Sequence, residues 1–353
     1  MVRWRDGTVT AVRRRWRGAV ELDVSLVRRR DDDPDTVRAL AYPAVVGEPG
    51  PGDRVLVNIN ALALGLGTGG YAMVVALPDR LPADGEPSGH EVKARYTPLQ
   101  VVVDAADSEG WVSLDGTPVV TADLHSALPA VVAGVHATRP DARVAYAMTD
   151  GGALPAWFSR TLDALADRLA GVVTTGQAFG GDIEATNVHS GLLAARHVFG
   201  ADVVVVTQGP GNLGTGTAWG FSGTAIGEAV NAVAALGGRA VGALRVSEAD
   251  PRPRHRGVSH HSLTAYGRVA LAPADLVVPA GLPEPLAGEV GAALGPLGAV
   301  HRLVRVDPAG LDEALRSLPV KLSTMGRDLD ADHAYFLAAA AAGRHAADLL
   351  TGR

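Results

Sequence analysis

The sequence of 353 residues contains no cysteine, and lysine occurs only at Lys93 and Lys321. Disulfide bonds, thiolate metal ligands and cysteine nucleophiles are therefore excluded. Schiff-base and phosphate-binding lysine chemistry is limited to two positions. No apolar run reaches the roughly 18 residues of a membrane span, and the N-terminal sequence MVRWRDGTVTAVRRRW lacks the apolar segment of a signal peptide. We therefore predict a cytoplasmic protein without membrane partners.

A strong charge of either sign is also missing. The net charge is -6 at pH 7, with 20% charged and 47% hydrophobic residues. This balance provides no global attraction to nucleic acid or to an anionic membrane surface. The length and the hydrophobic content are typical of a folded protein of two or three domains.

The first hundred residues have the pattern of β structure. They contain five short valine-rich runs that are separated by turn sequences such as GEPGPGD. We expect strands at 7–16, 19–27, 36–46, 53–62 and 70–77. Five strands in this length predict a small barrel, so we predict a β-barrel-like domain over 1–100.

Strands and helices alternate in the rest of the chain, over 101–353. The expected strands are 143–148, 172–175, 202–207, 240–246 and 301–306, and the expected helices are 155–169, 185–199, 221–236 and 332–350. Alternation of this kind predicts a three-layer α/β domain with a mainly parallel sheet and helices on both faces. The proline-rich stretch 273–285 is interpreted as a surface connection.

A glycine-rich segment follows the four valines that begin at Val203, with the sequence TQGPGNLGTGT. Its GPGNLG resembles a dinucleotide fingerprint, but no helix begins at once and no Walker lysine follows, so both nucleotide-loop interpretations are disfavoured. The segment instead predicts a nest of backbone N–H groups for an anion. The alternative is a turn that packs against a helix. The predicted ligand-binding residues are Gly209, Gly211, Asn212, Gly214, Thr215 and Gly216.

Polar residues follow four of the expected strands. Ligands bind outside the carboxyl ends of the strands in sheets of this kind, so we expect these residues to surround one site. Carboxylates there could act as bases or metal ligands, and histidines as acids or ligands. The candidate catalytic residues are Asp150, Asp182, Glu184, His255 and His260.

Four of these candidates, all except Glu184, have other interpretations. Asp150 before two glycines is typical of a turn, and Asp182 could be the N-cap of the next helix. For the histidines of HRGVSHHS, metal binding, proton transfer or anion contact, and a structural role all remain open. Adjacent His260 and His261 diverge by about 100° on a helix, so we expect at most one of them in the site.

Several long segments of the chain resemble one uncharacterised bacterial protein family, known only as a domain of unknown function. They are TDGGALP, GQAFGGDIEATNVHSGLLAA, GPGNLGTGTAWGFSG, HRGVSHHSLT and GHEVKARYTPLQ, together with STMGR at 323–327. The resemblance covers nearly the whole chain. It implies no activity and transfers no catalytic residue.

These observations favour an enzyme that acts on a small anionic or phosphorylated substrate held by the glycine-rich loop. The alternative is a non-catalytic binding or scaffold protein, which could contact RNA through the arginines between Arg3 and Arg30. Nucleic acid is the less favoured partner, and a homodimer remains open. The sequence identifies neither a cofactor nor a metal.

Overall fold

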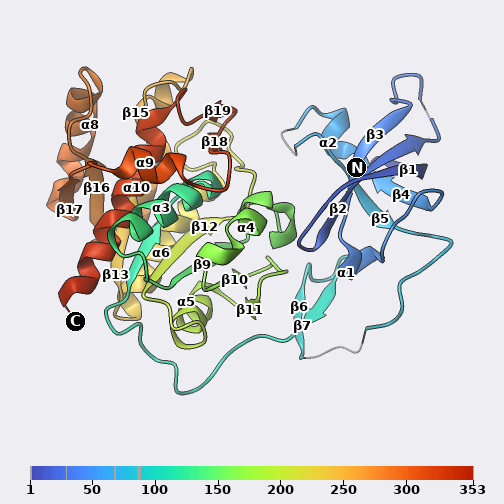
Figure 1. The fold of residues 1–353 in the computed structure, drawn as a ribbon, viewed down its shortest axis with the longest axis horizontal. Helices are drawn as coiled ribbons and strands as arrows, with labels where there is room; N and C mark the ends of the chain where they lie inside the picture. Colours follow the sequence, from blue (N-terminus) through green and yellow to red (C-terminus); the bar gives the residue numbers. More distant parts are fainter. Residues whose placement is uncertain (1, 29, 67–68, 86–88, 353) are drawn as a thin grey trace. The chain divides into compact units, whose positions relative to one another are not determined.

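The computed structural model describes residues 2–28, 30–66, 69–85 and 89–352. The chain forms two structural units (Figure 1). The first comprises 1–103 and 157–163, and the second comprises 104–156 and 164–353. Among the described residues, no helix combines the length and apolar character needed to cross a membrane.

The first unit contains a closed five-stranded barrel, which confirms the predicted N-terminal β-barrel. The strand order is β1-β2-β3-β5-β4, and β1 also pairs with β4 to close the barrel. The strands are β1 (Trp4–Trp16), β2 (Ala19–Leu26), β3 (Thr36–Ala41), β4 (Arg54–Asn58) and β5 (Ala72–Ala76). Alternate residues such as Leu22, Val24 and Val55 point inward and are fully buried, as the period of a strand requires.

Short elements complete the first unit. Two single-turn helices, α1 (Pro43–Val46) and α2 (Asn60–Ala63), connect barrel strands, and β6 (Glu91–Lys93) pairs with β7 (Val101–Val103). The segment 157–163 also groups with this unit. Its anchor is Trp157, whose carbonyl accepts a hydrogen bond from Trp16 Nε1 at 2.7 Å.

The second unit is built on an eight-stranded sheet in which every neighbouring pair is parallel, confirming the predicted α/β fold. The strand order is β11-β10-β9-β12-β8-β13-β16-β17. The strands are β8 (Pro118–Thr121), β9 (Val144–Thr149), β10 (Gly171–Thr175), β11 (Ile183–Ala185), β12 (Val203–Gln208), β13 (Arg239–Ala243), β16 (Asp275–Pro279) and β17 (Arg302–Val306).

Helices cover both faces of this sheet (Figure 1). On one face α3 packs against α10, and on the other α5 packs against α6. The helices of the second unit are α3 (Leu128–Thr138), α5 (Val188–His197), α6 (Ala225–Ala235), α7 (His260–Thr264), α8 (Leu286–Leu294), α9 (Leu311–Arg316) and α10 (His333–Asp348). Helix α4 (Arg160–Ala164) lies almost entirely in the segment that groups with the first unit. Two short hairpins, β14 (Val246–Ser247) with β15 (Gly257–Val258) and β18 (Ser323–Thr324) with β19 (Arg327–Asp328), lie outside the sheet.

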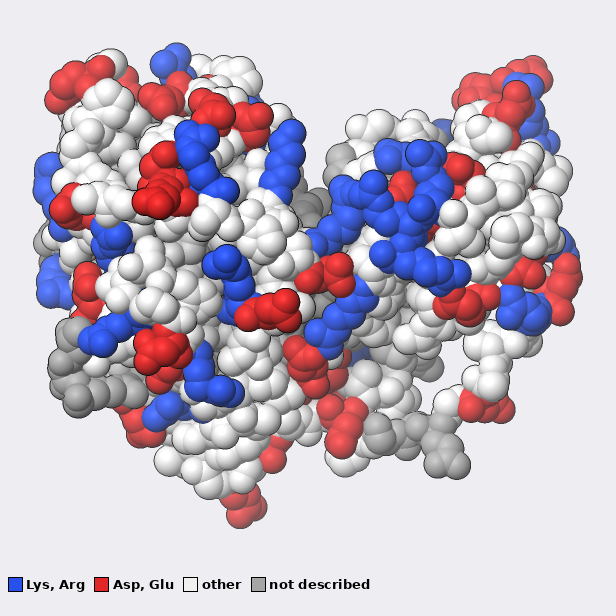
Figure 2. Space-filling model, in the orientation of Figure 1, with Lys and Arg blue, Asp and Glu red and all other residues white. Residues whose placement is uncertain are grey.

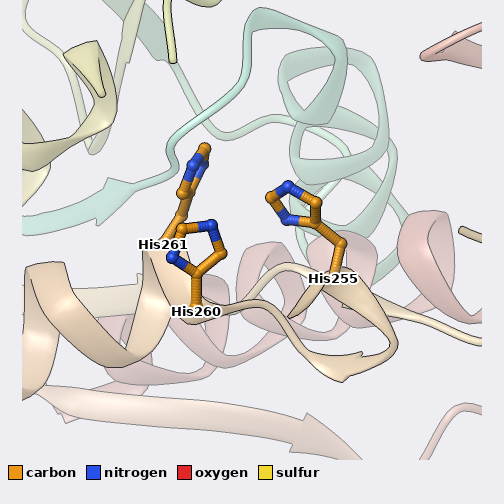
Figure 3. A group of neighbouring side chains, drawn as sticks. All are labelled: His255, His260 and His261. Atoms are coloured by element: carbon orange, nitrogen blue, oxygen red, sulfur yellow. The ribbon is translucent and has the colours of Figure 1, made fainter. Parts of the chain in front are cut away.

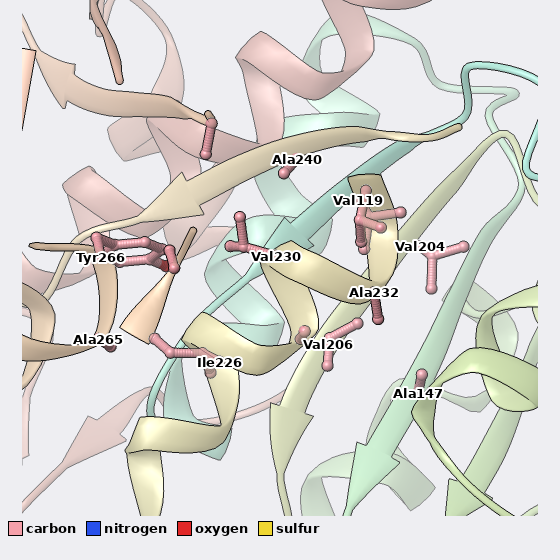
Figure 4. Close-up of a cluster of buried hydrophobic side chains, with 14 of the residues drawn as sticks. Val119, Ala147, Val204, Val206, Ile226, Val230, Ala232, Ala240, Ala265 and Tyr266 are labelled. Carbon is pink, nitrogen blue, oxygen red and sulfur yellow. The ribbon is translucent and has the colours of Figure 1, made fainter. Parts of the chain in front are cut away.

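The core of the second unit lies between the central strands and α6 (Figure 4). Val119 of β8 and Val204 and Val206 of β12 are fully buried there with Val230 of α6. All six residues of β12 are buried, as expected for a strand covered on both faces.

Four local predictions were wrong. The chain forms β8 and α3 before 143, where we predicted neither, and β16 lies inside the supposed surface connection 273–285. The prolines around β16 led to the prediction of a loop, but the residues between them form a strand in which Leu276 and Val277 are fully buried. The expected helix 155–169 contains only α4 between two 3-10 turns, and β11 precedes α5.

The connections that leave the two central strands, β8 and β12, run in opposite directions across the sheet. The connection from β8 passes through α3 to β9, which lies on the β12 side of β8. The connection from β12 passes through α6 to β13 on the other side of β8. Right-handed crossovers in opposite directions place their helices on opposite faces, and open α/β sheets bind ligands where such crossovers diverge, here at the carboxyl ends of β8 and β12. We call this place the switch point.

Helices α3 and α10 touch through glycines. A Cβ atom on Gly134 would lie 1.9 Å from the carbonyl oxygen of Ala340, and one on Gly343 would lie 2.1 Å from that of Val131. Neither backbone oxygen can move without shifting its helix. The absence of both side chains therefore determines how closely the two helices approach.

We expect Gly343→Ala to destabilise the protein by about 1–3 kcal/mol, because the new methyl group overpacks this crossing. The matched control is Gly291→Ala in the exposed α8, where an added Cβ meets no atom within 4 Å. That change should be neutral or stabilising by up to about 1 kcal/mol. Urea denaturation of both variants checks the difference, and equal effects would contradict the packing argument.

A second prediction concerns Asp275, which accepts hydrogen bonds from Arg302 on β17 and, at 2.7 Å, from His345 Nε2 on α10. Burial raises the pKa of Asp275, but the hydrogen bonds from His345 and Arg302 outweigh it and lower the pKa to about 2. Since the folded pKa lies below the unfolded value, this stabilisation is present above about pH 4 and is lost toward pH 2. We therefore expect Asp275→Asn to lower Tm at pH 7, with a difference from wild type that shrinks as the pH falls to 3.

Candidate functional site

Three polar side chains are buried where β8, β12 and β13 end. Asp123 lies two residues beyond β8, Gln208 is the last residue of β12, and Arg245 lies two residues beyond β13. Gln208 Nε2 donates to the backbone carbonyl of Asp123 at 2.7 Å and to Asn212 Oδ1 at 2.8 Å. These contacts join the loops that follow β8 and β12.

Three histidines come together beside them (Figure 3). The ring centroid of His255 lies 4.9 Å from the ring centroid of His260 and 4.9 Å from that of His261. The ring centroids of His260 and His261 are 4.5 Å apart. Each ring offers one nitrogen, and the three nitrogens lie within 4.8 Å of one another. Ser259 organises the group, because its Oγ accepts from the backbone N–H of His261 at the start of α7 and lies 2.8 Å from His255 Nδ1.

The expectation that only one of His260 and His261 enters the site was wrong. The two Cα–Cβ bonds diverge at the first turn of α7, but rotation about χ1 and χ2 lets both rings approach His255. The position of His261 is also set by Phe221, on which its ring stacks with centroids 3.8 Å apart and planes at 1°.

Asp123 faces this cluster. Its Oδ2 lies 3.5 Å from His261 Nδ1 and 3.7 Å from Arg245 Nη1, and its side chain is only 3% exposed. Within the described parts of the chain, neither Asp123 Oδ2 nor His261 Nδ1 has a hydrogen-bond partner. Burial raises the pKa of Asp123, but His261 and Arg245 outweigh it, so the net shift is downward and the carboxyl group is ionised.

His255 and His260 are held in their neutral form. Burial lowers the pKa of His255 to about 3, and the neighbouring charges of Arg245 and Arg252 add to this effect. Burial also lowers the pKa of His260, with contributions from His261 and Arg254. A neutral imidazole has one nitrogen lone pair free to accept a proton or to bind a metal ion.

A network of ion pairs fixes the loop that leads from β13 to His255. Asp250 accepts hydrogen bonds from Arg245 at 3.3 Å, from Arg252 at 2.8 Å and from Arg327 at 3.2 Å. Arg327 also donates to Asp332, just before α10. The desolvation of Asp250 raises its pKa, yet Arg252 and Arg327 lower it far more. The loop is thereby tied to α10.

The glycine-rich loop lies near the histidines, and three of its backbone N–H groups are bonded within the protein. The N–H groups of Gly209, Leu213 and Thr215 donate to Thr149 O, Ser222 Oγ and Gly220 O. Two glycines of the loop, Gly214 and Gly216, face the site. A Cβ on Gly214 would lie 4.0 Å from His261 Nε2, and one on Gly216 would lie 3.6 Å from the guanidinium of Arg254.

Asp150 lies at the same edge of the sheet. It follows β9 directly, and its carboxylate accepts from the backbone N–H of Gln177 at 2.9 Å. The next residue, Gly151, is adjacent to Gln208, since a Cβ there would lie 2.6 Å from Gln208 Oε1. The structure therefore places Asp150, the glycine-rich loop and the histidines along one edge.

Asp182 and Glu184 lie elsewhere. The carboxylate of Asp182 accepts from the backbone N–H of Val172, the second residue of β10, so Asp182 is near the amino end of that strand. Glu184 is buried within β11, where it accepts from Thr174 Oγ1 at 2.6 Å. The loop after β10 returns toward the amino ends of the strands before β11 begins, which removes Asp182 from the predicted site. Glu184 pairs with Thr174 near the carboxyl end of β10, but β11 is the outermost strand of the sheet, so Glu184 lies to the side of the predicted site. The N-cap of α5 is Asn187, so the N-cap interpretation of Asp182 was also wrong.

Sequence reasoning missed Asp123 and Arg245. Asp123 follows the apolar run PVVTA, a pattern like those used to select the other carboxylates, but no strand was predicted there. Arg245 fell inside the predicted strand 240–246, whose regular part ends at Ala243. The signal for Asp123 was present, whereas nothing in the sequence indicates that Arg245 pairs with a buried carboxylate.

The arginines of the barrel do not form an isolated basic surface. Residues 1–103 contain nearly equal numbers of basic and acidic residues. Figure 2 shows basic side chains gathered on the visible face of the barrel, with acidic side chains close to them. Arg13 pairs with Asp23 at 3.0 Å, and Arg38 approaches the buried Glu21. Arg29 lies outside the described residues.

The fold and the buried cluster define an α/β protein with a polar site at a topological switch point, joined to a five-stranded barrel. A family model described as "Protein of unknown function (DUF3866)" matches residues 38–343. The chain therefore belongs to this family, which confirms the resemblance. Comparison with curated proteins and with solved structures gave no match.

We expect Arg245→Met to destabilise the protein by about 3 kcal/mol or more, because the substitution leaves Asp123 buried without a countercharge. The matched control is Arg256→Met, an exposed arginine in the same segment, which should change stability by less than about 0.5 kcal/mol. Guanidinium chloride denaturation measures both. A small effect of Arg245→Met would show that Asp123 is neutral or solvated in the folded protein.

Proposed function

We propose that this protein is an enzyme that acts on a small anionic substrate bound at the switch point. The observation that supports this proposal is the convergence of Asp123, His255, His260 and His261 from separate loops into one largely buried cluster. Open α/β sheets bind their ligands at such crevices. Histidines beside a buried carboxylate are typical of acid–base or metal-assisted catalysis.

The free energy lost by burying unpartnered polar atoms argues against a purely structural role for the cluster. Four of its buried polar atoms have no hydrogen-bond partner within the described chain: Asp123 Oδ2, Gln208 Oε1, His260 Nε2 and His261 Nδ1. Each such atom costs about 1–3 kcal/mol in a folded protein. Apolar residues of similar volume would avoid this cost, so a functional gain is the simplest reason for the arrangement.

An anionic substrate is favoured by the charge beside the cluster. Arg254 and Arg256 are exposed, and neither side chain has a polar partner among the described residues. The guanidinium of Arg254 lies over Gly216 and contributes to the lowered pKa of His260, which places its charge near the histidines. Guanidinium groups bind phosphate and carboxylate through paired hydrogen bonds.

The roles of the residues follow from this arrangement. Arg254 and the exposed part of the glycine-rich loop would hold the anionic group. Asp123 would orient His261 by accepting from its Nδ1–H, which leaves the Nε2 lone pair beside Gly214. Arg245 would keep Asp123 ionised. Asp150 remains a candidate at the same edge, with no contact to the cluster that would define its role.

We expect the wild-type protein to bind members of a panel of small phosphorylated and carboxylated compounds, detected by thermal shift and quantified by isothermal titration calorimetry. Arg254→Ala should weaken the affinity for such ligands by roughly 10-fold to 100-fold, the value of a lost charge-assisted hydrogen bond. The matched control is Arg305→Ala, which removes an equal charge from the outer strand β17.

Two results would contradict the proposed function. One is equally tight binding of the neutral analogue of each ligand. The other is an equal loss of affinity in Arg254→Ala and Arg305→Ala, because it would show a general charge effect and not a site.

A further inference from the structure

We infer that His255, His260 and His261 bind one divalent transition-metal ion. This inference deepens the proposed function, because it names the cofactor of the same site, and its test is independent of any substrate. The histidines come from a short 3-10 turn (Pro253–His255) and from the start of α7, and Figure 3 shows their rings facing a common space.

The distances between the rings suit an ion after a small movement. One nitrogen from each ring lies within 4.8 Å of the others. Three nitrogens bound to a tetrahedral zinc ion at 2.0–2.1 Å lie about 3.4 Å apart. Rotation of the side chains about χ1 and χ2 can shorten distances of this size.

Two neighbouring groups orient the rings as second-shell ligands do. Ser259 Oγ lies 2.8 Å from His255 Nδ1, and Asp123 Oδ2 lies 3.5 Å from His261 Nδ1. In the tautomers that place hydrogen on Nδ1, both Nε2 atoms are free to bind an ion. A carboxylate that accepts from the second nitrogen of a ligating histidine is a common feature of metal sites. The absent side chain of Gly214 leaves space beside His261 Nε2.

The other buried histidines behave differently. His301 Nδ1 accepts from the backbone N–H of Ala274 at 3.1 Å, and its Nε2 donates to Tyr266 O at 2.7 Å. His345 Nε2 is bonded to Asp275. By contrast, His260 Nε2 and His261 Nδ1 are buried without a hydrogen-bond partner in the described chain. A bound ion would give His260 Nε2 a partner, whereas His261 Nδ1 faces Asp123 Oδ2.

The buried charges around the site compensate one another. Arg245 and Arg252 oppose a bound cation, but both donate to Asp250, and Arg245 also lies near Asp123. The two buried carboxylates, Asp123 and Asp250, therefore balance the charges of the two arginines near the ion. Neutral imidazoles without thiolate suit Zn²⁺, Cu²⁺, Ni²⁺ or Fe²⁺ better than Mg²⁺ or Ca²⁺.

The experiment uses the full-length, tag-free protein after dialysis against a chelator. Titration calorimetry with Zn²⁺ should detect one ion per chain, and Co²⁺ should give the visible absorption bands of nitrogen ligation. We expect His260→Ala and His255→Ala each to weaken Zn²⁺ binding by at least 100-fold. Asp123→Asn should weaken it by about 10-fold to 100-fold, as substitutions of second-shell carboxylates do.

The control is His189→Ala, which removes an exposed histidine on α5 and should leave the affinity unchanged. Circular dichroism verifies that each variant is folded. The inference is overturned if the wild-type protein takes up no Zn²⁺, or if folded His255→Ala and His260→Ala bind it as tightly as wild type. If the protein binds Zn²⁺ but binds no anionic compound of the panel, the proposed substrate class is refuted and the metal site is still supported.

Discussion

The buried charge pair between Asp123 and Arg245 is the constraint on which the candidate site depends. The two side chains leave neighbouring parallel strands at the centre of the sheet, and each is nearly inaccessible to water. A buried carboxylate is tolerated only with a countercharge, and a buried guanidinium likewise. Arg245 provides this countercharge for both Asp123 and Asp250. One guanidinium therefore connects the loop after β8, which carries Asp123, with the loop that carries the histidines.

The same network links the site to the frame of the fold. Arg327 bridges Asp250 and Asp332, and Ser247 donates to Asp332 immediately before α10 begins. Helix α10 is in turn held against α3 by the close approach at Gly134 and Gly343. A rigid support of this kind suits a site whose groups must keep fixed positions. It also explains how short elements such as α7 can present three histidines reproducibly.

Part of this organisation could be predicted. Valine-rich runs with turn sequences identified the barrel, and alternating strands and helices identified the α/β unit, because hydrophobic period and turn chemistry are local properties. The glycine-rich loop, Asp150 and the histidines were found from their positions after strands. Asp182 and Glu184 failed that rule for two reasons. The chain between β10 and β11 carries Asp182 toward the amino ends of the strands, and β11, which carries Glu184, is the outermost strand of the sheet. No local pattern records either position.

By itself, the sequence determined which segments become strands or helices and which chemical groups are available, including histidine and arginine but no cysteine. Only the tertiary structure decided which of those groups meet. Asp123 and His261 are far apart in the chain, and they face each other because β8 and β13 are neighbours in the sheet. Strand order depends on the packing of all the helices and strands together, so partners of this kind cannot be read from the sequence around either residue.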